Sequence, residues 1–141
     1  MSEMVYPRWT WCAEACPASE LLGVVSHRVQ GASMLTVAGL FNEFAQALAF
    51  PSYFGHNWDA FEECYRDAEW FGNETAAELI IDDADLVLSK GGTSDLDTFL
   101  SILNGGVERP ERDDQFVVKL LSRTPFPPHA WTALIPSLRV D

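Results

Sequence analysis

The sequence is poor in basic residues and contains no long apolar run. Nine of its 141 residues are Lys or Arg against 21 Asp and Glu, which gives a formal net charge of −12. This charge argues against a surface that binds nucleic-acid phosphates and favours a cationic partner or simple solubility. No apolar run approaches the roughly 18 residues of a membrane span, and the first fourteen residues lack a secretion-signal pattern. We therefore expect a soluble, cytoplasmic protein that binds neither nucleic acid nor membrane.

Cysteine and histidine are also scarce. The three cysteines (Cys12, Cys16 and Cys64) are too unevenly spaced for a disulfide framework, and the three histidines lie far apart in the chain. Cys12 and Cys16 have no second ligand pair at a zinc-like spacing. We expect reduced thiols, no metal site and no cofactor.

The sequence contains enough apolar residues for a packed core, since 48% of its residues are hydrophobic. We expect one domain over residues 1–141, with a core at about 22–122 and extensions over 1–21 and 123–141. Trp9, Trp11 and Trp131 are expected to pack these extensions against the core.

Periodicity and turn residues predict alternating strands and helices within the core. The predicted strands are 22–29, 78–81 and 116–121. The predicted helices are 36–50, 57–68, 84–88 and 93–104, with Asp82 or Asp83 capping the third. Residues 124–141 are expected to form an irregular or short-helical tail. Strands joined by helical crossovers give an α/β fold, with a three-stranded parallel sheet flanked by about four helices.

Most of the negative charge lies between Asp59 and Asp97. This window holds twelve acids and two bases, so it carries −10 of the net −12. A solvated acidic surface and a binding site for a basic partner both explain such a window, and the choice depends on which elements carry the acids.

The helix predicted over 57–68, with Asn57 as its N-cap, has two distinct faces. Its apolar stripe, which is expected to enter the core, comprises Trp58, Phe61, Cys64, Tyr65 and Ala68. Asp59, Glu62, Glu63 and Arg66 share the opposite face, where Glu62 and Arg66 form a favourable i, i+4 pair.

The preceding loop places aromatic rings beside these acids, and Gly55 lets its backbone turn tightly. A ring such as Tyr53 at the rim of an acidic face suits the binding of Arg or Lys. Two interpretations remain open at this point: a protein-binding site, or a solvated helix face that has no binding role.

The segment from Phe50 to Cys64, FPSYFGHNWDAFEEC, resembles the characteristic motif of the barstar family of ribonuclease inhibitors. About a dozen positions match in order, with Pro51, Gly55, Asn57 and Asp59 at fixed offsets. The resemblance in element order extends over about residues 22–122.

The resemblance implies a three-stranded parallel sheet with four helices, and a non-enzymatic function. A member of this family would bind a secreted microbial ribonuclease in a 1:1 complex, be monomeric when free, and place carboxylates where the RNA phosphate would lie. The partner-binding residues that it implies are Tyr53, Gly55, His56, Asn57, Trp58, Asp59, Glu62, Glu63 and Arg66.

Three departures from the family pattern imply a target other than barnase itself. Glu63 stands in place of the central Asp, which keeps the charge and lengthens the reach by one methylene. Glu62 replaces a Trp. A further acid, supplied in the prototype by its last helix, falls near Asn104 or Gly105 and is absent here.

Two other functions compete with this prediction. Catalysis is disfavoured because acids on one outward helix face do not oppose each other across a cleft, and no nucleophile motif is present. The alternative is an acidic interaction or immunity module that binds a different basic protein or a nuclease toxin, since the same acids serve any cationic surface.

Overall fold

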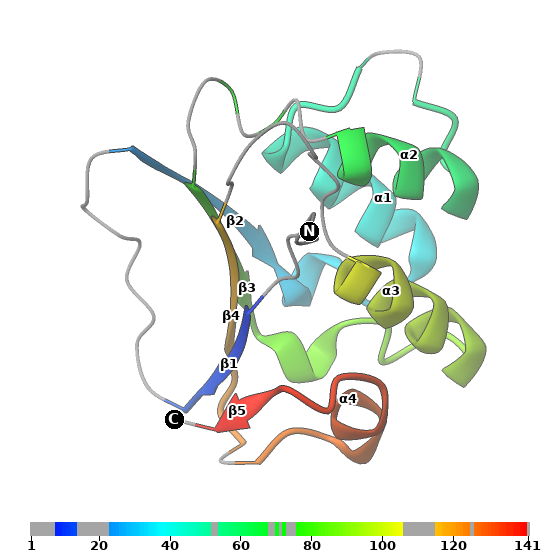
Figure 1. The fold of residues 1–141 in the computed structure, drawn as a ribbon. Helices are drawn as coiled ribbons and strands as arrows, with labels where there is room; N and C mark the ends of the chain where they lie inside the picture. Colours follow the sequence, from blue (N-terminus) through cyan, green and yellow to red (C-terminus); the bar gives the residue numbers. More distant parts are fainter. Residues whose placement is uncertain are drawn as a thin grey trace.

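The described part of the chain forms one parallel sheet with helices packed on one of its faces (Figure 1). The computed structural model describes residues 8–13, 23–51, 54–67, 70, 72, 76–105, 115–124 and 126–140. Its strands are β1 (Arg8–Cys12), β2 (Val24–Gln30), β3 (Ala76–Asp82), β4 (Gln115–Leu121) and β5 (Arg139–Val140). They lie in the order β2-β3-β4-β1-β5, and every neighbouring pair is parallel.

Four α-helices and two 3-10 turns lie in the described segments between the strands. The helices are α1 (Val37–Ala47), α2 (Trp58–Asp67), α3 (Thr93–Gly105) and α4 (His129–Leu134), and the turns are η1 (Gly31–Ser33) and η3 (Ala84–Leu86). All four helices cover the same face of the sheet (Figure 1). The α/β class and the parallel sheet are confirmed, and four α-helices flank the sheet, although the fourth is α4 in the predicted tail and not a helix over 84–88.

The prediction of three strands was wrong, because the sheet has five. Strand β1 pairs with β4 on one side and with β5 on the other. Both added strands come from segments expected to be extensions. Side chains alternate between the two faces of a strand, and in β1 this alternation buries Trp9 and Trp11, which are 2% and 0% exposed. The period-2 pattern of the RWTWC sequence was thus a readable strand signal. The predicted packing role of Trp9, Trp11 and Trp131 is confirmed, since all three are buried.

The predicted cap of the short helix after β3 was also wrong. Only the 3-10 turn η3 forms there, and no side-chain cap hydrogen bond closes its start. Asp83 instead adopts a left-handed conformation, with φ of 48°. The side chain of Asp82 accepts hydrogen bonds from Arg28 and Gln30, so neither aspartate is available as a cap.

One hydrophobic core fills the space between the sheet and the helices, and Phe61 of α2 lies within it at 0% exposure. Its ring packs against six others, with centroids 5.1–6.2 Å away: Phe41, Phe44, Phe50, Trp58, Tyr65 and Phe99. These contacts join α1, α2 and α3, so aromatic packing on its core-facing side fixes the position of α2.

The described part of the chain contains no helix that is long and apolar enough to cross a membrane.

Replacement of Trp11 tests whether β1 is an integral strand. The Trp11 indole packs edge-on against Trp131 at 5.7 Å, and its Nε1 donates to the Thr124 carbonyl oxygen at 3.0 Å. We expect Trp11→Ala to lower the free energy of unfolding by about 3–5 kcal/mol, measured by urea denaturation of the full chain. Phe126→Ala is the matched control, because Phe126 is 74% exposed and its loss should change stability by less than about 0.5 kcal/mol. Equal effects of the two changes would show that the N-terminal strand is dispensable.

Candidate protein-binding site

Helix α2 starts at the point where the sequence predicts. The Asn57 side chain caps it: Oδ1 accepts the backbone N–H of Ala60 at 2.8 Å, and Nδ2 donates to the Gly55 carbonyl oxygen at 3.2 Å. The cap satisfies one of the backbone donors that a helix N-terminus leaves without an intrahelical partner. It also joins the helix to the loop in front of it, so the loop and the first turn of α2 form one unit.

The tight turn in this loop lies at His56 rather than at Gly55. His56 has a left-handed φ of 51°, a conformation that a non-glycine residue adopts at some cost and mostly where its surroundings enforce it. The His56 ring is held on both sides, with Nδ1 3.0 Å from the Phe54 carbonyl oxygen and Nε2 3.2 Å from Asn42 Oδ1. Gly55 instead leaves room for the cap, because a Cβ there would lie 3.1 Å from Nδ2 of the Asn57 side chain. Tyr53 lies outside the described residues.

The inner face of α2 is held by a buried tyrosine as well as by Phe61. Tyr65 is 0% exposed, and its hydroxyl donates to the Leu103 carbonyl oxygen at 3.0 Å. Burial raises the pKa of the Tyr65 phenol well above its ordinary value, so the group stays a neutral donor. Trp58 and Cys64 are half-buried against the core, which confirms most of the predicted stripe. Its last member, Ala68, lies outside the described residues.

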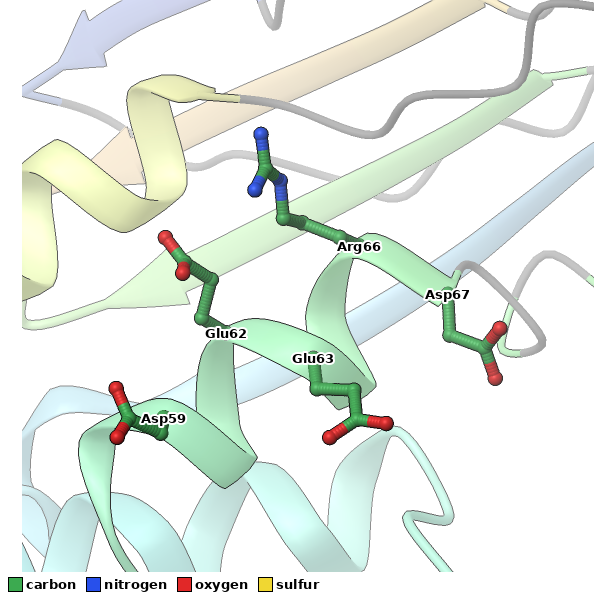
Figure 2. Close-up of a pocket in the computed structure, with 5 residues that line it drawn as sticks. All are labelled: Asp59, Glu62, Glu63, Arg66 and Asp67. Carbon is green, nitrogen blue, oxygen red and sulfur yellow. The ribbon is translucent and has the colours of Figure 1, made fainter.

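The outer face of α2 carries four carboxylates and one guanidinium around a shallow open hollow of about 440 Å³. Asp59, Glu63 and Asp67 are exposed, and Glu62 and Arg66 are half-exposed. Figure 2 shows Glu62 and Arg66 on one side of the helix ribbon, and Glu63 and Asp67 on the other. The predicted outward face is therefore present, and no described element covers Glu63.

Asp67 belongs to this face although sequence reasoning missed it. Asp59, Glu63 and Asp67 stand at i, i+4 and i+8, about 6 Å apart along the helix axis. Two like-charge i, i+4 pairs destabilise a helix by about 0.2–0.5 kcal/mol each, and an acid in the last turn also opposes the helix dipole. Within the described part of the chain, no hydrogen bond or ion pair compensates these three carboxylates. The signal was readable, since Asp67 continues the same helical spacing.

Other acids of the 59–97 window have structural partners. Glu78 is 4% exposed; its Oε2 lies 2.9 Å from Lys119 Nζ, and its Oε1 accepts a hydrogen bond from the Ser26 hydroxyl at 2.6 Å. Asp85 accepts a hydrogen bond from Ser122 at 2.9 Å.

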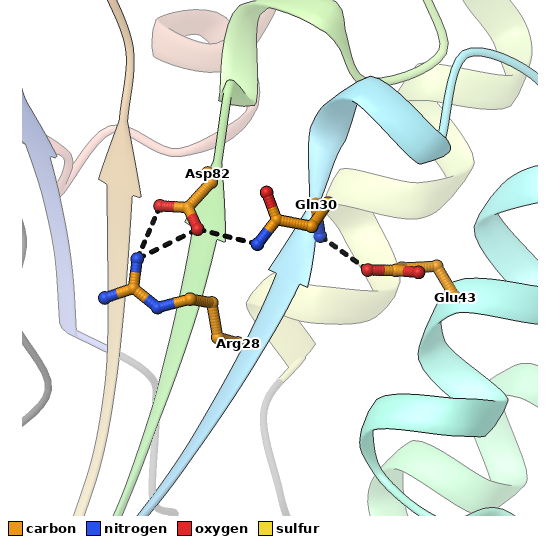
Figure 3. A network of polar contacts seen from close by, with 4 residues as sticks. All are labelled: Arg28, Gln30, Glu43 and Asp82. Carbon is orange, nitrogen blue, oxygen red and sulfur yellow. Dashed lines mark hydrogen bonds and ion pairs between the residues drawn. The ribbon is translucent and has the colours of Figure 1, made fainter.

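A second group of partnered acids lies at the C-terminal end of β2 (Figure 3). Asp82 binds Arg28 at 2.7 Å and accepts from the Gln30 amide at 2.9 Å, while the Gln30 backbone N–H donates to Glu43 at 2.8 Å. Paired acids of this kind hold the sheet and α1 together. Asp59, Glu63 and Asp67 of α2 therefore differ from these neighbours, because they are exposed and have no such partner among the described residues.

Neither Asn104 nor Gly105, at the end of α3, supplies a carboxylate. Asn104 carries an amide whose Oδ1 accepts from the Trp9 indole at 3.2 Å, and Gly105 has no side chain. The negative surface consequently runs along α2 and does not continue onto this end of α3.

The chemistry available at the α2 face is that of binding cations. Its acids project from one helix into an open hollow rather than facing each other across a cleft, as hydrolysis by paired carboxylates requires. Among the described residues, no group of three or more His, Cys, Asp or Glu side chains is arranged to hold a metal ion.

Fold and site together define a small α/β protein that presents an acidic helix on an aromatic core. A family model described as Barstar (barnase inhibitor) matches residues 24–121, well over half of the chain, so this protein belongs to the barstar family. The family is described as one of barnase inhibitors and not of enzymes. A search of curated proteins finds no match to this chain.

The Asn57 cap can be tested by two substitutions. Asn57→Ala removes the acceptor for the Ala60 N–H and should lower the free energy of unfolding by about 1 kcal/mol, measured in urea. Asn57→Ser keeps an N-cap oxygen and should retain most of that stability. If both variants are as stable as the natural chain, the cap does not fix the start of α2.

Proposed function

We propose that this protein inhibits a secreted microbial ribonuclease by placing the acidic face of α2, with the loop before it, in the active site of the enzyme. The observation that carries the proposal is the uncompensated row of Asp59, Glu63 and Asp67 on a helix fixed from below by Phe61. Membership of the barstar family supports an inhibitor of this kind. The inhibitor would stay in the cell that makes it and protect that cell's RNA.

The mechanism rests on replacement of a phosphate by carboxylates. A ribonuclease binds the RNA phosphate with cationic side chains. A carboxylate is negatively charged like the phosphate and accepts charge-assisted hydrogen bonds from those same side chains. Glu63 is exposed in the middle of the row and takes the central place, with Asp59 and Asp67 one turn away on either side. Because the helix is rigid before the partner arrives, little conformational entropy is lost on binding.

The loop supplies the second half of the contact surface. Gly55, His56 and Asn57 are exposed, and Trp58 is half-buried beside them. In the proposed complex, Tyr53 and Trp58 provide apolar contact area around the charged centre, as aromatic residues commonly do in interfaces. Glu62 and Arg66 border the row on its other side, where they select among ribonucleases.

The departures from the family pattern point to a target with a different charge layout. The absence of an acid at Asn104 and Gly105 leaves that end of α3 without negative charge, while Asp59, Glu63 and Asp67 line the outer face of α2. We infer a partner whose cationic side chains are arranged to face the length of α2. A small guanyl-specific ribonuclease other than barnase is the preferred candidate.

Titration into cleavage assays of several guanyl-specific ribonucleases tests the function. We expect stoichiometric 1:1 loss of RNA cleavage for at least one of them. Glu63→Gln should weaken that binding at least tenfold, which corresponds to about 1.4 kcal/mol. Asp97→Asn is the matched control, because Asp97 is an exposed acid on α3, and it should change the affinity less than about twofold. Absence of inhibition and binding across the panel would contradict the proposal, and so would equal effects of the two variants.

The rate of association provides a separate test of the role of charge. Opposite fields steer the encounter of charged partners, as they do for barnase and barstar. Raising the salt from about 0.1 M to about 1 M shortens the Debye length from about 10 Å to about 3 Å. The association rate constant, measured by stopped flow, should therefore fall steeply while dissociation changes little. An association rate independent of salt would show that the acidic face does not guide docking.

A further inference from the structure

His27 of β2 lies between the two ends of the segment that carries the proposed binding face. Its side chain is on the helix-covered face of the sheet, as are those of Val25 and Val29. Its Nδ1 is 3.0 Å from the carbonyl oxygen of Ala47, the last residue of α1, and its Nε2 is 2.8 Å from the carbonyl oxygen of Trp70. Ala47 precedes the binding loop and Trp70 follows α2, so one imidazole ring contacts both flanks of this segment.

The two partners of the ring restrict its protonation state. A backbone carbonyl oxygen can only accept a hydrogen bond, and a neutral imidazole carries a single N–H. Only the imidazolium, with a proton on each nitrogen, can donate to both oxygens at these distances. We propose that His27 is a doubly protonated imidazolium in the folded protein, and that it clamps the segment between Ala47 and Trp70 onto strand β2.

The surroundings of the ring suit a positive charge. The C-terminal end of a helix carries partial negative charge on carbonyl groups without intrahelical partners. Helix α1 has no basic residue in its last turn, and His27 supplies a cation there from a neighbouring strand. The ring also packs edge-on against the indole of Trp70, with centroids 5.5 Å apart.

The charged and titratable groups around His27 have other partners. On β2, Arg28 points to the opposite face of the sheet and binds Asp82. On α1, Glu43 accepts the backbone N–H of Gln30, and on α2 the Tyr65 hydroxyl donates to Leu103. Of the residues that the structure describes, the ring's hydrogen-bond partners are thus the two carbonyl groups.

The clamp connects the sheet edge to the acidic face of α2. Besides receiving a hydrogen bond from His27, Trp70 donates one from its indole Nε1 to the Tyr65 carbonyl oxygen at 3.0 Å. Tyr65 lies on the inner face of α2, beneath the row of acids. His27 is accordingly a positioning residue for that row, and this part of the inference rests on the proposed function.

The charge of His27 is tested without any ribonuclease, by nitrogen NMR of the ¹⁵N-labelled histidine rings in the full chain. At about pH 7.5, a histidine in water is mostly neutral, whereas we expect both ring nitrogens of His27 to carry protons. The exposed His129 provides the comparison in the same spectrum. Because the chain has three histidines, His56→Gln and His129→Gln assign the remaining ring signals to His27. A single unprotonated nitrogen in the His27 ring at this pH would overturn the proposed charge.

The positioning role is tested by affinity for the ribonuclease that the natural protein inhibits. His27→Gln removes the cation, and we expect it to weaken binding about threefold to tenfold. His129→Gln makes the same chemical change at an exposed site and should leave affinity unchanged. Unaltered binding by His27→Gln would overturn the positioning role even if the ring is doubly protonated. If that variant does not fold, the NMR measurement on the natural protein still decides the charge, and failure of the ribonuclease proposal leaves that result intact.

Discussion

The packing of Phe61 beneath helix α2 is the constraint on which the rest of the structure depends. Its fully buried ring lies among aromatic side chains of α1, α2 and α3, so α2 can rotate or slide only by disrupting the core. A helix fixed in this way can keep like charges on its outer face, although those charges would destabilise an isolated helix of ten residues. The acidic surface is therefore a consequence of aromatic packing, and its rigidity is available before any partner binds.

The distribution of acids follows from two different demands. Acids near the sheet, such as Glu78 and Asp82, lie within hydrogen-bond distance of Lys119 and Arg28 and help to hold neighbouring strands. Asp59, Glu63 and Asp67 on α2 are exposed and lack such partners among the described residues. A net charge of −12 alone could not separate these roles, because an acid in a strand and an acid on a helix count equally in a composition. Their placement is the reason why we propose α2 as the docking surface for a cationic partner.

Much of the fold could be predicted because its central elements carry strong local signals. The start of α2 follows from Asn57, a good N-cap, and its buried face follows from the spacing of Phe61 and Tyr65. The strands β1 and β5 were missed because they are short and far from their partner in sequence. Strand pairing over such separations leaves little local trace, and only the alternation of Trp9 and Trp11 marked β1. The turn at His56 and the network around Asp82 were not predictable, since both depend on contacts that form only in the folded chain.

The central claim is that the acidic face of α2 is the surface that a ribonuclease contacts. Hydrogen–deuterium exchange of the full chain, measured with and without the ribonuclease that it inhibits, tests this claim most directly. The account predicts that slowed exchange on complex formation is concentrated in residues 54–67, while the amides of β4 and α4 exchange as in the free protein. Slowed exchange centred on β4, β1 or α4, with residues 54–67 unaffected, would contradict it.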